Sequence, residues 1–144
     1  PIFPAVGYRF DYKGRSVVIS GDTVASDNLV RLAKDADLLV HEVLVVSVID
    51  LASEAANAAG RTRRAKLASD ILDYHTSPAD AVEVAKRAGV DTVVFSHMVP
   101  PLPEFLVGTV FMRGVDDEGK VDVVLGEDLM RFRLPAGSDE VQQP

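Results

Sequence analysis

Two side chains with metal-binding chemistry each follow a strand-like stretch of this sequence. Asp22 comes after the apolar residues 17–19 and the turn residue Gly21, and His97 ends a second apolar stretch, 92–97. An oxygen ligand and a nitrogen ligand at neighbouring strand ends can hold a hard or borderline divalent cation. The residue types therefore predict a metal site that includes Asp22 and His97.

A second pairing concerns proton transfer. Glu42 follows His41 at the end of another apolar stretch, and His75 comes just before a helix start. A carboxylate such as Glu42 beside His75 would fix the tautomer of the imidazole and raise its basicity, as a general acid requires. His41 is interpreted as structural, or as supporting a ligand without touching a metal.

Each of these residues also has an ordinary structural interpretation. Asp22 alone is typical of a turn residue that binds its own backbone, and His97 alone is typical of a partly buried histidine. His75 could simply precede a helix cap. What favours chemistry is that all three histidines of the chain and Asp22 are expected at one edge of a single sheet.

The positioning elements follow from hydrophobic periodicity and capping signals. The pattern predicts a hairpin of strands 5–11 and 15–20, a helix near 29–33, a strand at 37–44, helices at 49–59 and 63–74, a helix at 78–88, a strand at 90–95, a helix at 104–113, and strands at 121–125 and 129–134 around a turn. Two strand–helix–strand units in this order indicate parallel crossovers, and ligands of open α/β sheets bind at the carboxyl ends of the strands.

Composition limits the classes of protein. At 144 residues, with 47% hydrophobic residues, the chain is long enough for a single domain, 1–144, with a buried core. A net charge of −7 argues against nucleic-acid binding through a global positive field. The chain has no cysteine, so any metal must be held by histidine and carboxylate. No apolar run approaches a membrane span, so we expect a soluble protein, with the cytoplasm as the default compartment.

One local departure from the acidic character is a group of four bases near Gly60, namely Arg61, Arg63, Arg64 and Lys66. The ordinary interpretation is a solvated helix face. The functional alternative is a patch that meets an anionic substrate.

Four motifs in this order resemble the carboxyl-terminal half of the metallo-β-lactamase fold, in the branch of ribonuclease Z and the arylsulfatase-like hydrolases. They are Ser20-Gly21-Asp22-Thr23, His41-Glu42, His75-Thr76-Ser77 and Val94-Phe95-Ser96-His97. The resemblance covers about residues 5–100. It implies an α/β chain, α+β in some schemes, that forms one mixed sheet with outer helices as half of a four-layer αββα sandwich.

The resemblance also implies roles for the site residues. Asp22 corresponds to the carboxylate that bridges two zinc ions, and His97 to the last histidine ligand. His75 corresponds to the histidine that protonates the leaving group, and Glu42 to the carboxylate that orients it. The implied enzyme is a metal-dependent hydrolase, with two zinc ions, acting on phosphodiesters or sulfate esters; its partner would be a small anionic ester, or RNA if it is a ribonuclease Z.

The family's first half carries a His-x-His-x-Asp-His loop that this chain lacks. We therefore expect a fragment, inactive until completed by the missing amino-terminal half or by a homo-oligomer partner, with residues 135–144 as a frayed tail. Residues 100–103 and 121–130 resemble small arylsulfatase-like hydrolases more than tRNA processors. Two alternatives stay open: a catalytically dead half-domain that associates through its exposed sheet face, and a lactonase or thioesterase of the same fold.

Overall fold

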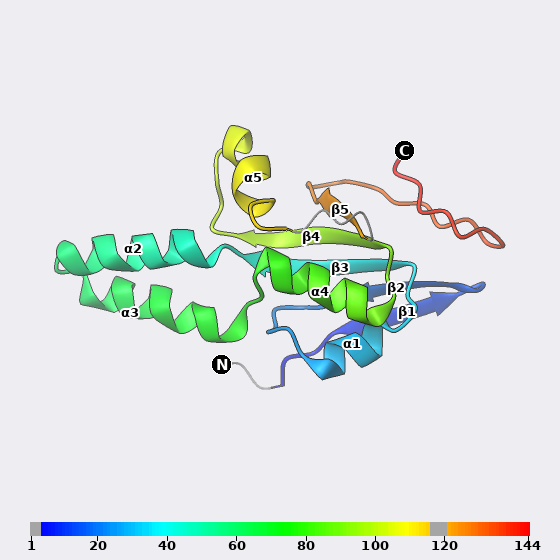
Figure 1. Cartoon of the computed structure of the whole chain (residues 1–144), viewed down its shortest axis with the longest axis horizontal. Helices are drawn as coiled ribbons and strands as arrows, with labels where there is room; N and C mark the ends of the chain where they lie inside the picture. The colour runs from blue at the N-terminus through cyan, green and yellow to red at the C-terminus, as the bar shows by residue number, and fades with distance from the viewer. Residues whose placement is uncertain (1–3, 116–120) are drawn as a thin grey trace.

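A computed structural model describes residues 4–115 and 121–144 of the chain. Five strands form one mixed sheet in the order β1-β2-β3-β4-β5, and two of the helices, α1 and α4, lie against one of its faces (Figure 1). The elements are β1 (Tyr8–Tyr12), β2 (Arg15–Ile19), α1 (Asp27–Ala33), β3 (Leu38–Leu44), α2 (Val46–Ala58), α3 (Thr62–Ile71), the 3-10 helix η1 (Leu72–Tyr74), α4 (Pro78–Ala88), β4 (Thr92–Val99), α5 (Glu104–Phe111) and β5 (Asp122–Leu125).

Strands β2, β3, β4 and β5 run parallel, and β1 pairs antiparallel with β2 as the predicted hairpin. Helix α1 connects β2 to β3, and α4 precedes β4, so both predicted crossover units are confirmed. The capping signals act as expected. The Ser77 hydroxyl accepts a hydrogen bond from the Asp80 amide at the start of α4, and Gly89 ends that helix at a φ of 71°.

The core lies between the sheet and the pair of helices α1 and α4. Leu39, Val93 and Phe95 are completely buried on the sheet side, and Ala81 and Ala85 of α4 are completely buried opposite them. Small residues on α4 let the helix approach the strands closely. This packing holds the carboxyl ends of three parallel strands at one edge of the sheet.

The opposite face is open along β1 and β2. Tyr8 pairs with Ile19 and Phe10 pairs with Val17, which places these side chains on one face. Tyr8, Phe10 and Tyr12 are 58%, 56% and 73% exposed. The apolar face that the sequence predicts to be uncovered is therefore exposed along these two strands.

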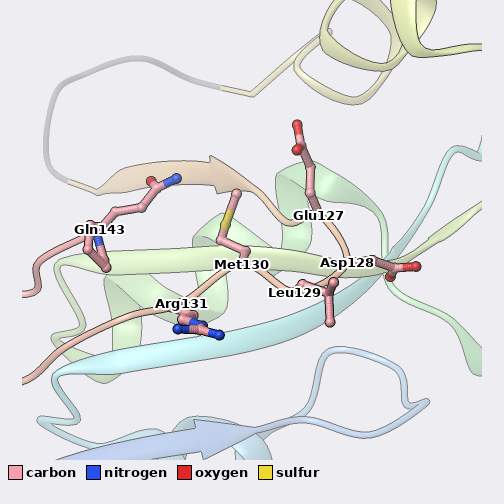
Figure 2. A pocket seen from close by; sticks show the side chains of 7 residues that line it. Glu127, Asp128, Leu129, Met130, Arg131 and Gln143 are labelled. Carbon is pink, nitrogen blue, oxygen red and sulfur yellow. The ribbon is translucent and has the colours of Figure 1, made fainter.

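Over β3 and β4 the same face meets the segment 126–132. Figure 2 shows residues 127–131 of this segment crossing in front of β4, where they line one pocket together with Gln143. A hollow between the segment and the sheet is lined by Val40, Val94 and Ser96, together with His97. The carboxyl-terminal segment thus lies beside the edge where the site was predicted.

The strand predicted at 129–134 is wrong. Among the described residues of this stretch, only Arg133 forms a β-bridge, with Gln142, through backbone hydrogen bonds of 2.8 and 2.9 Å. The physical reason lies at Gly126, whose amide donates to the Phe95 carbonyl of β4. The chain therefore leaves β5 across β4 instead of turning back, and Leu129 then adopts a φ of 68° with 95% of its surface exposed.

Other boundaries differ by a few residues. Helix α2 begins three residues earlier than predicted, η1 completes the predicted 63–74 helix, and β4 extends to Val99. In the tail, Arg15 donates a 3.1 Å hydrogen bond from Nη2 to the Glu140 carbonyl. No helix among the described residues is long and apolar enough to cross a membrane.

The turn at Gly21 delivers Asp22 and has little tolerance for a side chain. Its φ is 65°, and a Cβ there would lie 2.5 Å from the Val6 carbonyl oxygen. We expect Gly21→Ala to lower the free energy of unfolding by about 2–4 kcal/mol, from backbone strain plus the clash. Gly60→Ala is the matched control, because Gly60 has a φ of 69° but open space around it. It should lower the free energy of unfolding by about 1–2 kcal/mol, the penalty of the left-handed conformation alone, as measured by denaturant unfolding. Equal losses in the two variants would contradict the clash.

Candidate active site

The predicted site residues converge at the carboxyl ends of β2, β3 and β4. Asp22 follows β2, Glu42 lies near the end of β3, His97 lies near the end of β4, and His75 lies between η1 and α4. The rings of His75 and His97 are 5.6 Å apart between centroids. One site therefore contains all four residues.

Asp22 and His97 are in direct contact. His97 Nδ1 lies 2.9 Å from Asp22 Oδ1, and both side chains are more than half exposed. An oxygen and a nitrogen donor on one open rim are suited to a divalent cation. This juxtaposition of two strand ends is the geometry on which the predicted metal site depends.

A β-bulge directs His97 into the site. Glu42 pairs with Ser96, but the next residue of β3, Val43, pairs with Met98, so His97 is the extra residue on β4. Its φ is 41°, a conformation that non-glycine residues rarely adopt. Bulges commonly re-aim a side chain beside an active site, and here β4 continues past the histidine where the sequence predicted that the strand would end.

Glu42 and His75 form a second, buried pair. Glu42 Oε2 lies 2.8 Å from His75 Nδ1, and Glu42 Oε1 accepts a 2.8 Å hydrogen bond from the Thr76 amide. The Glu42 side chain is 2% exposed and that of His75 is 8% exposed. With a carboxylate at Nδ1, the proton of neutral His75 belongs on that nitrogen, which leaves Nε2 as the reactive atom.

Burial raises the pKa of the Glu42 carboxyl above its ordinary value, while the hydrogen bonds from His75 and Thr76 act in the opposite direction. Removal from water thus opposes ionisation of Glu42, and the contact with His75 partly compensates. A carboxylate that holds an imidazole in one orientation suits a proton donor and its orienting group.

Hydroxyl groups that the sequence analysis did not single out for a role join the loops of the site. The Ser20 hydroxyl accepts a 3.1 Å hydrogen bond from the Glu42 amide and donates to the Gly21 carbonyl. The Thr76 hydroxyl donates a 2.6 Å hydrogen bond to the Thr23 carbonyl. The sequence does contain a signal for these two hydroxyl groups. Each lies within one of the four quoted motifs, Ser20 two residues before Asp22 and Thr76 next to His75.

His41 does not join the site. Its ring is completely buried, and Nδ1 donates a 2.7 Å hydrogen bond to the Glu42 carbonyl. Within the described residues, Nε2 has no hydrogen-bond partner. Burial lowers the pKa of His41 against the opposing effect of that backbone bond, so the ring is neutral in the interior.

Two groups of residues here could hold a metal ion. Ligand atoms of Glu42, His75 and His97 all lie within 4.8 Å of one another. Both oxygens of Glu42 are engaged, however, by His75 and by the Thr76 amide. Asp22 is the better carboxylate ligand because it is exposed and contacts His97 directly. The donor types fit zinc, but Asp22 and His97 alone provide too few ligands for a closed site.

The Glu42–His75 contact makes a spectroscopic prediction. In Glu42→Gln the carbonyl oxygen is required by the Thr76 amide, so the side-chain NH2 must face His75 Nδ1. Neutral His75 should then change from the Nδ1–H to the Nε2–H tautomer, which imidazole 15N chemical shifts report. Ser20→Ala is the control, because it removes the acceptor of the Glu42 amide and leaves the carboxylate in place. An unchanged Nδ1–H tautomer in Glu42→Gln would contradict the assignment.

Comparison with known proteins agrees with this site. Residues 3–98 match the family described as "Beta-lactamase superfamily domain". A putative ribonuclease Z of Mycobacterium tuberculosis (strain CDC 1551 / Oshkosh) is 40% identical over 102 residues, which are 71% of this chain and 41% of that protein. Ribonuclease Z of Mycobacterium avium (strain 104) is 34% identical over 146 residues, covering 96% of this chain and 45% of the relative.

Two solved structures are similar in fold. The metallo-β-lactamase fold protein YhfI from Bacillus subtilis aligns with a TM-score of 0.50 at 17% identity, over 83% of this chain and 40% of that one. Human tRNase Z, short form, aligns with a TM-score of 0.50 at 25% identity, over 86% of this chain and 35% of that one. The chain spans less than half the length of these relatives. Its sequence match over two thirds of its residues and its fold place it in the beta-lactamase superfamily, as a ribonuclease Z-like member with the metallo-β-lactamase fold.

Proposed function

We propose that this chain supplies the carboxyl-terminal half of a zinc-dependent hydrolase that cleaves phosphodiesters in RNA. The observation that carries the proposal is the meeting of two pairs, Asp22 with His97 and Glu42 with His75, with the two imidazole rings 5.6 Å apart. The ribonuclease Z relatives support RNA as the substrate. Because the chain covers less than half of each relative, we assign the remaining metal ligands to a second half of the fold. The two halves together are called the complete enzyme.

In this mechanism Asp22 and His97 would hold zinc through a carboxylate oxygen and an imidazole nitrogen. Bound zinc supplies a hydroxide near neutral pH and polarises the phosphoryl oxygen. The chain's own contribution to the chemical step is His75. Glu42 holds its Nδ1–H, so that protonated His75 can donate its Nε2 proton to the leaving oxygen as the P–O bond breaks. The neutral ring that remains is still oriented by Glu42.

A sulfate-ester hydrolase is a second candidate, predicted from the resemblance of the tail. The described geometry serves either ester, because both reactions release an oxygen that needs a proton. A third candidate is a catalytically inactive module that associates through Tyr8, Phe10 and Tyr12, which are exposed on one sheet face. Light scattering that finds a monomer would count against the module.

The role of Asp22 is tested by metal content. In the complete enzyme, Asp22→Ala should weaken zinc binding by on the order of tenfold or more and abolish hydrolysis of an aryl phosphodiester. Zinc is measured by elemental analysis of the dialysed protein. Asp50→Ala, an exposed carboxylate on α2, is the matched control. Wild-type zinc content and activity in Asp22→Ala would overturn the role.

The role of His75 is tested by leaving-group dependence. His75→Ala should retain zinc and lower kcat by about 10²- to 10⁴-fold for substrates with poor leaving groups. A p-nitrophenolate leaving group needs little protonation, so its release should be affected far less. An equal loss of kcat for good and poor leaving groups would remove the general-acid role.

A further inference from the structure

The helical hairpin α2–α3 extends beyond the carboxyl ends of β3 and β4, away from the sheet (Figure 1). In the sequence the hairpin lies between Glu42 and His75, the two residues of the buried pair. Helix α2 begins four residues after Glu42, and η1 ends just before His75. Its base is tied to the site, because the Leu44 amide donates to the Thr76 carbonyl and the Val45 amide to the Val99 carbonyl. The hairpin is therefore an extension of the edge that carries the candidate site.

The tip of the hairpin is positively charged, whereas the rest of the molecule is acidic. Residues 55–69 contain four basic residues and no acid, whereas the other residues contain 11 basic and 22 acidic ones. Arg61, Arg63 and Arg64 are exposed, and no carboxylate of the described chain forms an ion pair with them. Lys66 pairs with Asp70 at 2.9 Å on the surface. Three guanidinium groups are thus available to an external anion.

Packing holds the two helices of the hairpin together. Ile49 of α2 and Ala65 of α3 are buried, and the Ser53 hydroxyl donates a 3.1 Å hydrogen bond to the Ala65 carbonyl. A 13-residue helix such as α2 is about 20 Å long. A small ester bound at His75 cannot reach that far, whereas a polynucleotide of about six base steps can.

We propose that Arg61, Arg63 and Arg64 form a phosphate-binding surface that positions an RNA substrate while its scissile bond lies at the site. The inference rests on the proposed function and adds to it a surface that binds the RNA substrate away from the scissile bond. In an acidic molecule, a local positive group at the end of a projecting arm attracts the RNA backbone without a global positive field. Guanidinium groups suit this task because they bind phosphate oxygens in a bidentate manner.

The test compares two substrates in the complete enzyme. The first variant is Arg61→Gln/Arg63→Gln/Arg64→Gln. It should raise KM for a structured RNA by on the order of tenfold, with kcat unchanged. It should also reduce the slope of log kcat/KM against log salt concentration by about 2 to 3. Its hydrolysis of bis(p-nitrophenyl) phosphate should match wild type. The corresponding Arg→Lys triple variant should recover most of the RNA affinity. The control variant Lys13→Gln/Lys34→Gln, at the other edge of the sheet, should leave kcat and KM unchanged for both substrates.

The outcomes separate this inference from the proposed function. If the Gln variant binds and cleaves RNA like wild type while the diester is hydrolysed, the surface is wrong and the proposed function stands. If wild type hydrolyses no diester, the proposed function fails, and fluorescence anisotropy with a labelled RNA still decides the surface. If the Gln variant changes only self-association, the tip binds the acidic body of a second copy, and the inference is overturned.

Discussion

The buried carboxylate of Glu42 is the interaction on which the site depends. A charge removed from water is costly unless it is paired and hydrogen-bonded, and Glu42 obtains both partners from the segment that begins α4. One side chain thereby fixes the end of β3, the orientation of His75 and the return of the chain from the hairpin α2–α3. Truncating Glu42 would leave the Thr76 amide without its acceptor, so deletion of the side chain would not test its proposed catalytic role separately from its structural one.

The edge of the sheet contains two pairs with different environments. Glu42 and His75 are buried, whereas Asp22 and His97 are open to solvent. Burial and the 2.8 Å contact hold the first pair in one geometry. Exposure leaves the second pair accessible to an ion and to further ligands. The difference comes from topology, because Asp22 lies in a loop beyond β2 while Glu42 lies within β3, covered by the segment before α4.

The sequence predicted most of this arrangement because its signals are local. The Ser77-Pro78 cap, the Gly89 end of α4 and the apolar stretches of β2, β3 and β4 each reflect the backbone conformation of a few residues. The bulge at His97 could not be predicted, because it depends on the register between β3 and β4, which are distant in sequence. The strand predicted at 129–134 failed for a similar reason: the Gly126–Phe95 hydrogen bond carries the chain across β4, and alternation in sequence does not report it.

The proposal of a divided site has a thermodynamic consequence. If zinc is held by Asp22 and His97 together with residues of a second half, its binding energy contributes to association of the halves and not only to catalysis. The exposed face of Tyr8, Phe10 and Tyr12 would add burial of apolar surface to the same association. Metal binding and sheet packing would then be coupled, since each orders groups that the other requires. On this reasoning the open face and the incomplete ligand set are two aspects of one divided fold.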